Sequence, residues 1–374
     1  MKRLVLILGM LFPIAIAAQE GNPSPAKNQS ASAASVTARV VLAGDEVASE
    51  PKDSSAGVAG PDANAPQQPK AKPSQSPPAP VETRPKIPGS MVGYIDDPIV
   101  GSQIRIRMEA GFKDNAPDRA EFFYPQCGCN GGGAPGPQPG ASNNINFQQL
   151  YFLAEYAPVG RFSVFAEVPI RWIQPQSFIP GTFATSTFPN QSGISDVRAG
   201  FKLAVSASSN HSLTLQFKAY FPSGDGSEGL GTAHYSVEPS LLYYQRLSDR
   251  WSIESQIGGW LPINGSKLAG RDYAGDIFFY GIGPSYQLVN RENIQFAPVV
   301  ELLGWHVLGG LQLVETPAGT PTVADASGTN IVNVKVGART SFGKHHSVYA
   351  GFGQAVTHAV WYEHVIRAEY RYSF

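Results

Sequence analysis

The chain has 374 residues, of which 42% are hydrophobic and 15% are charged, and its formal net charge is −1. A net charge this close to zero creates no electrostatic field that would attract nucleic acid or an anionic surface, so we expect no nucleic-acid partner. Beyond the N-terminal apolar run, no stretch reaches the roughly 18 apolar residues that a transmembrane helix needs.

The N-terminus has the pattern of a secretory signal peptide. Lys2 and Arg3 precede an apolar run over residues 4–16, and the small residues Ala17 and Ala18 follow. A charged start, an apolar core and a small-residue cleavage site are typical of an exported precursor. We therefore predict a signal peptide over residues 1–18, cut near Ala17 or Ala18.

Residues 19–90 consist mainly of Ala, Pro, Ser, Gln and Lys, with almost no aromatic side chains. Such a composition cannot bury enough apolar surface to offset the loss of chain entropy, so we expect a disordered, extended tail. A spacer without specific contacts explains this composition best. The alternative is a periplasmic tether that contacts peptidoglycan or a partner protein.

From about residue 100 the sequence changes to alternating polar and apolar segments, each long enough to cross a membrane as a tilted strand. About twelve such segments cover residues 101–111, 145–158, 161–173, 194–206, 211–222, 234–247, 250–262, 273–288, 291–305, 329–341, 345–355 and 359–374. Short turns alternate with mostly longer loops, as in outer-membrane barrels, and an even strand number puts both termini in the periplasm. The predicted fold is all-β: a single antiparallel transmembrane β-barrel of about 12 strands within residues 91–374, preceded by the tail.

The first long loop contains both cysteines of the chain, Cys127 and Cys129, in a segment rich in Gly and Pro. In an oxidising compartment they can form a strained disulfide or remain an exposed dithiol, and a local clip of the loop is the simpler interpretation. Two cysteines alone are too few for a zinc site. We predict neither a metal nor a cofactor.

The alternation within the strands predicts which side chains face the lumen. In residues 196–205, Asp196, Arg198 and Lys202 share one parity, and mostly aliphatic or aromatic residues share the other. An Arg or Lys that faces lipid at the bilayer midplane costs about 2–4 kcal/mol, so the charged parity is assigned to the lumen. Applied to the other strands as well, this argument gives the candidate lumen residues Arg105, Arg107, Glu167, Arg171, Asp196, Arg198, Lys202, Lys218, Glu238, Glu254, Asp276, Glu301, Lys335, Arg339, Arg367, Glu369 and Arg371.

Positive and negative charges are balanced in the predicted lumen, whereas a strongly ion-selective pore would have an excess of one sign. Balanced charges favour ion pairs across the lumen. A barrel of about eight strands has a filled interior, and one of about sixteen has an open channel. Twelve strands therefore predict a narrow, partly obstructed pore.

Tryptophans lie near the ends of the predicted strands. Trp172, Trp260, Trp305 and Trp361 fall at outer ends, and Trp251 falls at an inner end. Because amphipathic rings prefer membrane interfaces, we expect these residues in the two aromatic belts. Trp361 is the exception, because it has the lumen parity and fits the mouth of the pore.

A series of motifs in the middle of the barrel resembles a known family. Residues 193–202 read GISDVRAGFK, residues 217–225 read FKAYFPSGD, residues 229–232 read GLGT and residues 237–241 read VEPSL. This order resembles the outer-membrane transporter family labelled "MetA-pathway of phenol degradation, putative". The resemblance implies a barrel that passes small solutes, aromatic ones among them, and it brings no binding residues with it.

The last nine residues, 366–374, alternate strictly between apolar or aromatic side chains and charged or polar ones, and they end on Phe374. In a closed barrel the last strand pairs with the first, so no free edge remains. The pattern resembles the C-terminal targeting signal of bacterial outer-membrane barrels. It implies delivery by the barrel-assembly machinery to the outer membrane of a Gram-negative bacterium.

These features predict a monomeric outer-membrane pore or passive transporter for small solutes, surrounded by outer-membrane lipid. The alternative is a plugged barrel that acts as an envelope anchor or interaction protein. A lipid hydrolase that uses His358 and His364 is a third interpretation. No convincing Ser motif or orienting Asn or Asp accompanies these histidines, so we predict no enzyme.

Overall fold

The computed structural model describes residues 89–114, 142–178, 190–265, 267–268, 270–315, 321–358 and 361–374. The predicted signal peptide, the predicted tail up to residue 88, and the pair Cys127 and Cys129 lie outside the described residues. Among the described residues, no helix is long and apolar enough to cross a membrane.

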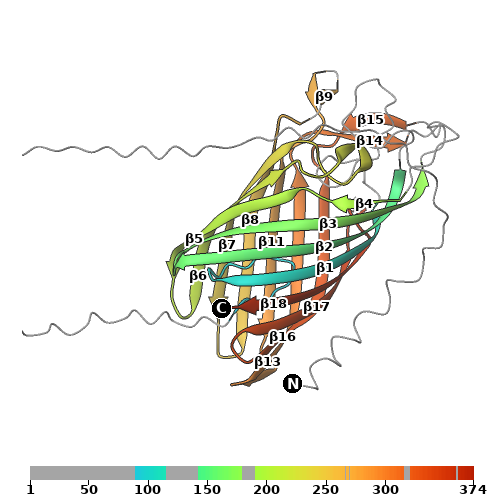
Figure 1. Ribbon diagram of the computed structural model, residues 1–374. Coiled ribbons are helices and arrows are strands. Elements are labelled where there is room, and N and C mark those ends of the chain that lie inside the picture. Colours follow the sequence, from blue (N-terminus) through green and yellow to red (C-terminus); the bar gives the residue numbers. More distant parts are fainter. Residues whose placement is uncertain are drawn as a thin grey trace, which may run out of the picture. The chain divides into compact units, whose positions relative to one another are not determined.

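The described chain is built almost entirely of strands (Figure 1). In chain order the elements are β1 (Gln103–Asp114), β2 (Ser142–Val159), β3 (Phe162–Phe178), β4 (Gln191–Ile194), β5 (Val197–Ala207), β6 (His211–Phe221), η1 (Gly226–Glu228), β7 (Tyr235–Arg246), β8 (Trp251–Ile263), β9 (Lys267–Leu268), β10 (Arg271–Asp272), β11 (Ile277–Tyr286), β12 (Val289–Arg291), β13 (Ile294–Val307), β14 (Leu311–Glu315), β15 (Pro321–Asp325), β16 (Asn330–Phe342), β17 (His346–Ala355) and β18 (His364–Ser373). Each of the twelve predicted segments overlaps one of the long strands.

Twelve of these strands pair antiparallel in a closed ring, which confirms the predicted barrel. The order around the ring is β1, β2, β3, β5, β6, β7, β8, β11, β13, β16, β17 and β18. Ring closure uses the C-terminal strand, because β18 pairs with β1 from Gln103 opposite Ser373 to Phe112 opposite His364. The final apolar strand therefore has no free edge.

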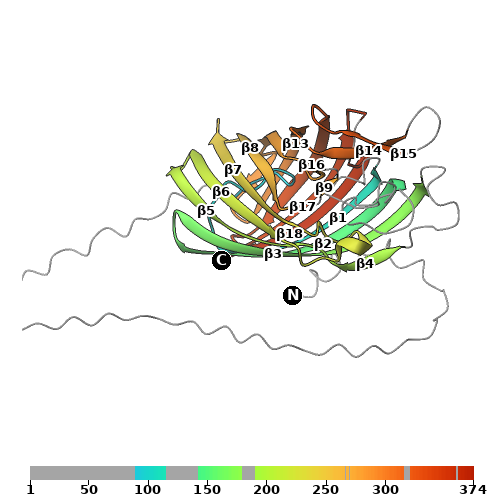
Figure 2. The same ribbon diagram turned by 90° about the horizontal axis from the view of Figure 1, so that it is seen from above.

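The barrel has two different ends, which we call the turn end and the loop end. The turn end contains the short connections at residues 160–161, 208–210, 247–250 and 343–345, together with the start of β1 and the end of β18. The loop end contains the longer connections, in which the short elements β4, η1, β9, β10, β14 and β15 occur (Figures 1 and 2).

Burial alternates along the strands as side-chain parity requires. In β1, Ile104 and Ile106 are 49% and 39% exposed, whereas Arg105 and Arg107 between and beside them are buried. Exposed aliphatic and aromatic side chains recur around the outside of the ring in the same way. Because the outer face is apolar and the inner face is charged, the ring is suited to hydrocarbon outside and polar groups inside.

The motif region folds into a clasped loop at the loop end. The Asp196 carboxylate accepts hydrogen bonds from the backbone N–H of Gly224 at 3.1 Å and of Thr232 at 2.7 Å, and from the Thr232 hydroxyl at 2.6 Å. A side chain on Gly231 would overlap Asp196, which is why the GLGT motif needs glycine there. Asp196 is buried, and its recorded hydrogen bonds fix the loop between β6 and β7.

Candidate functional site

Most of the candidate lumen residues are buried inside the barrel. The buried set consists of Arg105, Arg107, Glu167, Arg171, Asp196, Lys202, Glu238, Glu254, Glu301, Lys335, Arg339, Arg367, Glu369 and Arg371. Arg198 and Lys218 are half-buried, and Asp276 is exposed just before β11. Asp276 has the parity of the exposed Phe278 and Ile282, and the buried residues of β11 have the other parity, so its lumen assignment is not supported.

Ion pairs connect charged side chains within a strand, on adjacent strands and on strands separated by one other strand. Glu167 lies 3.1 Å from Arg198 and 3.3 Å from Arg107, and Glu369 lies 2.8 Å from Arg339 and 3.2 Å from Arg371. Further pairs are Glu109 with Arg367, Glu155 with Lys202, and Glu238 with Lys218. Paired charges of both signs leave little net field along most of the wall.

An N-terminal segment, residues 89–100, lies inside the barrel, and we call it the plug (Figure 2). Its backbone is held by carboxylates of the wall. Glu301 accepts hydrogen bonds from the N–H groups of Gly93, Tyr94 and Ile95 at 2.8–2.9 Å, and Glu254 accepts one from Met91 at 2.8 Å. Several charge-assisted hydrogen bonds to one short segment hold it in a single conformation.

Further polar groups of the plug contact the wall. The Arg339 guanidinium donates to the carbonyl of Val92 at 2.7 Å, and Arg367 donates to the carbonyl of Gly93. Two plug carboxylates pair with wall cations, Asp96 with Lys218 at 3.0 Å and Asp97 with Arg371 at 2.8 Å. The plug thus neutralises some of the wall charges that the strand pattern predicts, and it fills the turn-end half of the lumen.

Sequence reasoning missed the plug, although a weak signal exists. Residues 91–95 are Met-Val-Gly-Tyr-Ile, a cluster of large apolar residues at the end of a long, mainly polar tail. The predicted boundary between tail and barrel, at residues 90 and 91, falls inside the plug. Ser90 and Met91 are only 1% and 2% exposed.

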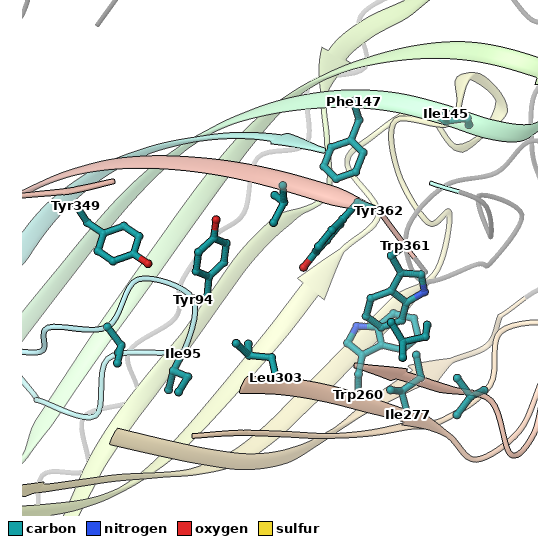
Figure 3. Close-up of a cluster of buried hydrophobic side chains, with 14 of the residues drawn as sticks. Tyr94, Ile95, Ile145, Phe147, Trp260, Ile277, Leu303, Tyr349, Trp361 and Tyr362 are labelled. Carbon is teal, nitrogen blue, oxygen red and sulfur yellow. The ribbon is translucent and has the colours of Figure 1, made fainter. Parts of the chain in front are cut away.

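Above the plug, towards the loop end, lies a cavity of about 210 Å³ that we call the chamber. Its lining contains nine aromatic residues: Tyr94, Phe147, Tyr151, Tyr220, Trp260, Phe279, Trp305, Trp361 and Tyr362. Figure 3 shows Tyr94, Phe147, Trp260, Trp361 and Tyr362 among them. Tyr94 of the plug forms part of its floor, and Trp305 and Trp361 contact each other with ring centroids 4.8 Å apart. Of the other lining residues, two are aliphatic and eleven are charged or polar, so the chamber combines aromatic rings with many polar groups.

The tryptophan prediction was wrong for two residues, Trp260 and Trp305. Trp260, Trp305 and Trp361 all line the chamber, and Trp260 and Trp361 are 8% and 1% exposed. Trp260 has the same parity as Glu254, and Trp305 the same parity as Glu301, so their strands turn both rings inward. Only for Trp361 had the sequence predicted this position.

Cations lie against several of the chamber's aromatic rings. The Arg107 guanidinium is 4.0 Å from the ring centroid of Tyr151. The Tyr94 ring has Lys335 Nζ at 3.9 Å and Arg367 Cζ at 4.0 Å from its centroid. Desolvated cation–π contacts of this kind contribute roughly 0.5–2 kcal/mol each and fix the orientation of the rings.

A second cavity of about 40 Å³ continues from the chamber along the side of the plug. Asp96, Arg107, Arg198 and Lys218 line both cavities, so these four side chains form a neck between them. Because the second cavity is lined mainly by charged groups and has room for about one or two waters, the neck restricts passage.

The histidines of the hydrolase interpretation lie apart from the chamber. His358 is exposed in the connection before β18. His364 lies 3.2 Å from Glu363, and its ring stacks on Phe352 with centroids 5.8 Å apart. The contacts recorded for His364 are those of a surface residue at the end of a strand.

The family model described as "Putative MetA-pathway of phenol degradation" matches residues 142–296, which are less than half of the chain. The resemblance drawn from the motifs is thereby confirmed, and the matched region contains the Asp196 clasp and part of the chamber wall. No protein of curated function matches the chain by sequence.

Solved structures with a similar fold include outer-membrane proteins. An outer membrane channel from Pseudomonas putida F1 is 13% identical, with a TM-score of 0.44, and the match covers 74% of this chain and 96% of that one. The KdgM porin is 12% identical, with a TM-score of 0.37 and coverage of 73% and 99%. The toluene transporter TodX of Pseudomonas putida is 10% identical, with a TM-score of 0.37 and coverage of 73% and 89%. At these identities the likeness concerns the fold alone.

Proposed function

We propose that this protein is a channel of the Gram-negative outer membrane that admits small aromatic solutes from the loop end. The observation that supports it best is the chamber, an aromatic-lined cavity inside a barrel whose outer face is apolar. In outer-membrane barrels short turns face the periplasm, so the turn end and the N-terminal tail are assigned to the periplasmic side. The loop end then faces the outside.

The aromatic lining suits an aromatic solute for a physical reason. Rings that stack edge-to-face or offset gain roughly 0.5–1.5 kcal/mol beyond their buried area. Trp305, Trp361 and Tyr362 come from β13 and the connection before β18, and all three line the chamber. A solute held there lies directly above the neck.

The plug favours a second candidate, a barrel that is permanently closed and acts as an envelope anchor. Its hydrogen bonds to Glu301, Glu254 and Arg339 are numerous enough to keep the lumen occupied. For both candidates we propose a monomer that is surrounded by outer-membrane lipid and is inserted by the barrel-assembly machinery through β18.

Ion current through the purified protein in a planar bilayer tests the proposal. We expect small, steady conductance steps, and we expect added phenol to reduce the current in a saturable way. Trp361→Ala should weaken this block, whereas Trp251→Ala, which removes an exposed ring at the turn end, should leave it unchanged. A silent bilayer would support the anchor, and a current that phenol does not alter would refute the aromatic route.

A further inference from the structure

The chamber contains a buried cation that has no carboxylate partner. Lys335 on β16 is 2% exposed and lines the chamber. Among the described residues, no Asp or Glu oxygen lies within 4.0 Å of its Nζ, in contrast to Lys202 and Lys218, which both form ion pairs. A buried, unpaired charge is costly, so its retention in the wall calls for an explanation.

The nearby carboxylates are engaged elsewhere. Glu109 pairs with Arg367 at 2.9 Å. Glu301 accepts its hydrogen bonds from the plug backbone and from Tyr349. Neither group lies close enough to pair with Lys335, and Arg367 adds a second cation on the same Tyr94 ring.

Aromatic side chains surround the ammonium group. The Lys335 Nζ donates a hydrogen bond to the Tyr362 hydroxyl at 2.7 Å, and it lies 3.9 Å from the Tyr94 ring centroid and 5.6 Å from that of Trp305. One recorded hydrogen bond leaves two of the three ammonium donors for a ligand. The rings hold the cation in place without neutralising it.

A second donor is directed at the same space. The Tyr94 hydroxyl is buried, and it has no hydrogen-bond partner among the described residues. Tyr94 is 7% exposed and lines the chamber floor. A buried hydroxyl without a partner costs about 1–3 kcal/mol, which an acceptor group on a ligand would recover.

From this arrangement we propose that the chamber binds small aromatic carboxylates, with Lys335 and the Tyr94 hydroxyl holding the carboxylate and Trp305 and Trp361 contacting the ring. The inference rests on the proposed function and gives it a solute class. The ammonium and the hydroxyl supply donors to the two carboxylate oxygens, and the ligand charge neutralises the buried cation. Because the ligand replaces no existing ion pair, binding requires no wall side chain to lose a partner.

Calorimetric titration of the full-length protein in detergent tests this inference with three probes of similar size: benzoate, benzyl alcohol and benzyltrimethylammonium. We expect benzoate to bind about tenfold tighter than benzyl alcohol or more, since hydrogen bonds to charged groups contribute about 1.5–3 kcal/mol each. Benzyltrimethylammonium should bind no tighter than benzyl alcohol, because it would meet an unpaired cation.

Two variants identify the residues. Lys335→Met should lower the affinity for benzoate to that for benzyl alcohol and leave the affinity for benzyl alcohol unchanged. Tyr94→Phe keeps the ring and removes only the hydroxyl, so it should lower the affinity for benzoate several-fold. This variant serves as the test if Lys335→Met does not fold. Lys113→Met removes an exposed cation on β1 near the loop end, and it should change neither ligand.

The outcomes separate this inference from the proposed function. If wild-type protein binds benzyl alcohol and benzoate equally, or if both the Lys335 and the Tyr94 variant keep the preference for benzoate, the carboxylate site is refuted and the aromatic chamber stands. If neither aromatic ligand binds, the proposed function fails together with the site.

Discussion

Replacing Gly93 by Ala should displace the plug. A Cβ at position 93 would lie less than 3.0 Å from ring carbons of Tyr349, whereas ordinary carbon contacts are about 3.5–4.0 Å. The Tyr349 ring cannot move aside easily. It is fully buried, and its hydroxyl donates to Glu301 at 3.1 Å. Gly337 and Gly351 pack directly against the ring.

The size of the effect follows from two contributions. Overpacking in a closed interior costs about 1–3 kcal/mol. A shift of residue 93 also strains the hydrogen bonds that Gly93, Tyr94 and Ile95 donate to Glu301, each of which is worth about 1.5–3 kcal/mol. Loss of one such bond brings the total to roughly 3–6 kcal/mol. The ratio of docked to undocked plug should therefore fall by about two orders of magnitude or more relative to wild type.

Single-channel conductance in planar bilayers measures the change, because a displaced plug no longer fills the turn-end half of the lumen. Gly93→Ala should give larger and less uniform conductance steps than wild type. Gly101→Ala is the matched control, since a Cβ there meets no atom within 4 Å. If the two variants conduct alike, residues 89–100 do not limit the pore and the account of the plug is refuted.

Three further predictions concern the plug anchor and the loop clasp. Glu301→Gln keeps one acceptor but removes the charge, so its conductance should lie between those of wild type and Gly93→Ala; a wild-type value would contradict the role of Glu301. Asp196→Ala removes the three hydrogen bonds that this carboxylate accepts from Gly224 and Thr232. Hydrogen exchange of residues 222–234 should therefore rise by an amount equivalent to about 2–4 kcal/mol while strand protection is retained; an unchanged loop would show that the clasp is unimportant. Burial lowers the pKa of His234, and the upward effects of Thr232 and Asp196 on this pKa are smaller. The clasped loop is therefore fully stable above the pKa of an unfolded histidine, near 6.5, and it loses stability as the pH falls below that value. Exchange of this loop, corrected for the intrinsic rate, should accelerate between pH 7.5 and 5.5, and His234→Phe should remove that dependence; equal pH dependence in both proteins would contradict it.

Strand number, strand order and facing could be predicted from the sequence because lipid imposes a strict rule on them. In β1 the alternation of Ile104, Arg105 and Ile106 allows only one orientation at a reasonable free energy. Closure by β18 follows from the same parity together with the need to avoid an open edge. These features depend on neighbours in sequence or on the membrane, and both can be read from a single chain.

The plug and the chamber depend on contacts between distant residues, so the pattern did not reveal them. Glu301 accepts hydrogen bonds from backbone groups more than 200 residues away, and backbone donors have no sequence signature. The same separation hid the environment of Lys335, which looks like any other lumen cation until Tyr94 is placed over it. The rings of Trp260 and Trp305 were misplaced because interface preference was given more weight than strand parity.

The central claim, that the chamber above the plug holds small aromatic solutes, is tested most directly by locating one. Crystals of the full-length protein soaked with 4-bromophenol would report the position of the bromine by its anomalous scattering. The account predicts a peak inside the barrel, between Tyr94 of the plug and the rings of Trp305, Trp361 and Tyr362. Bromine found only on the outer, lipid-facing surface, with none in the chamber, would contradict it.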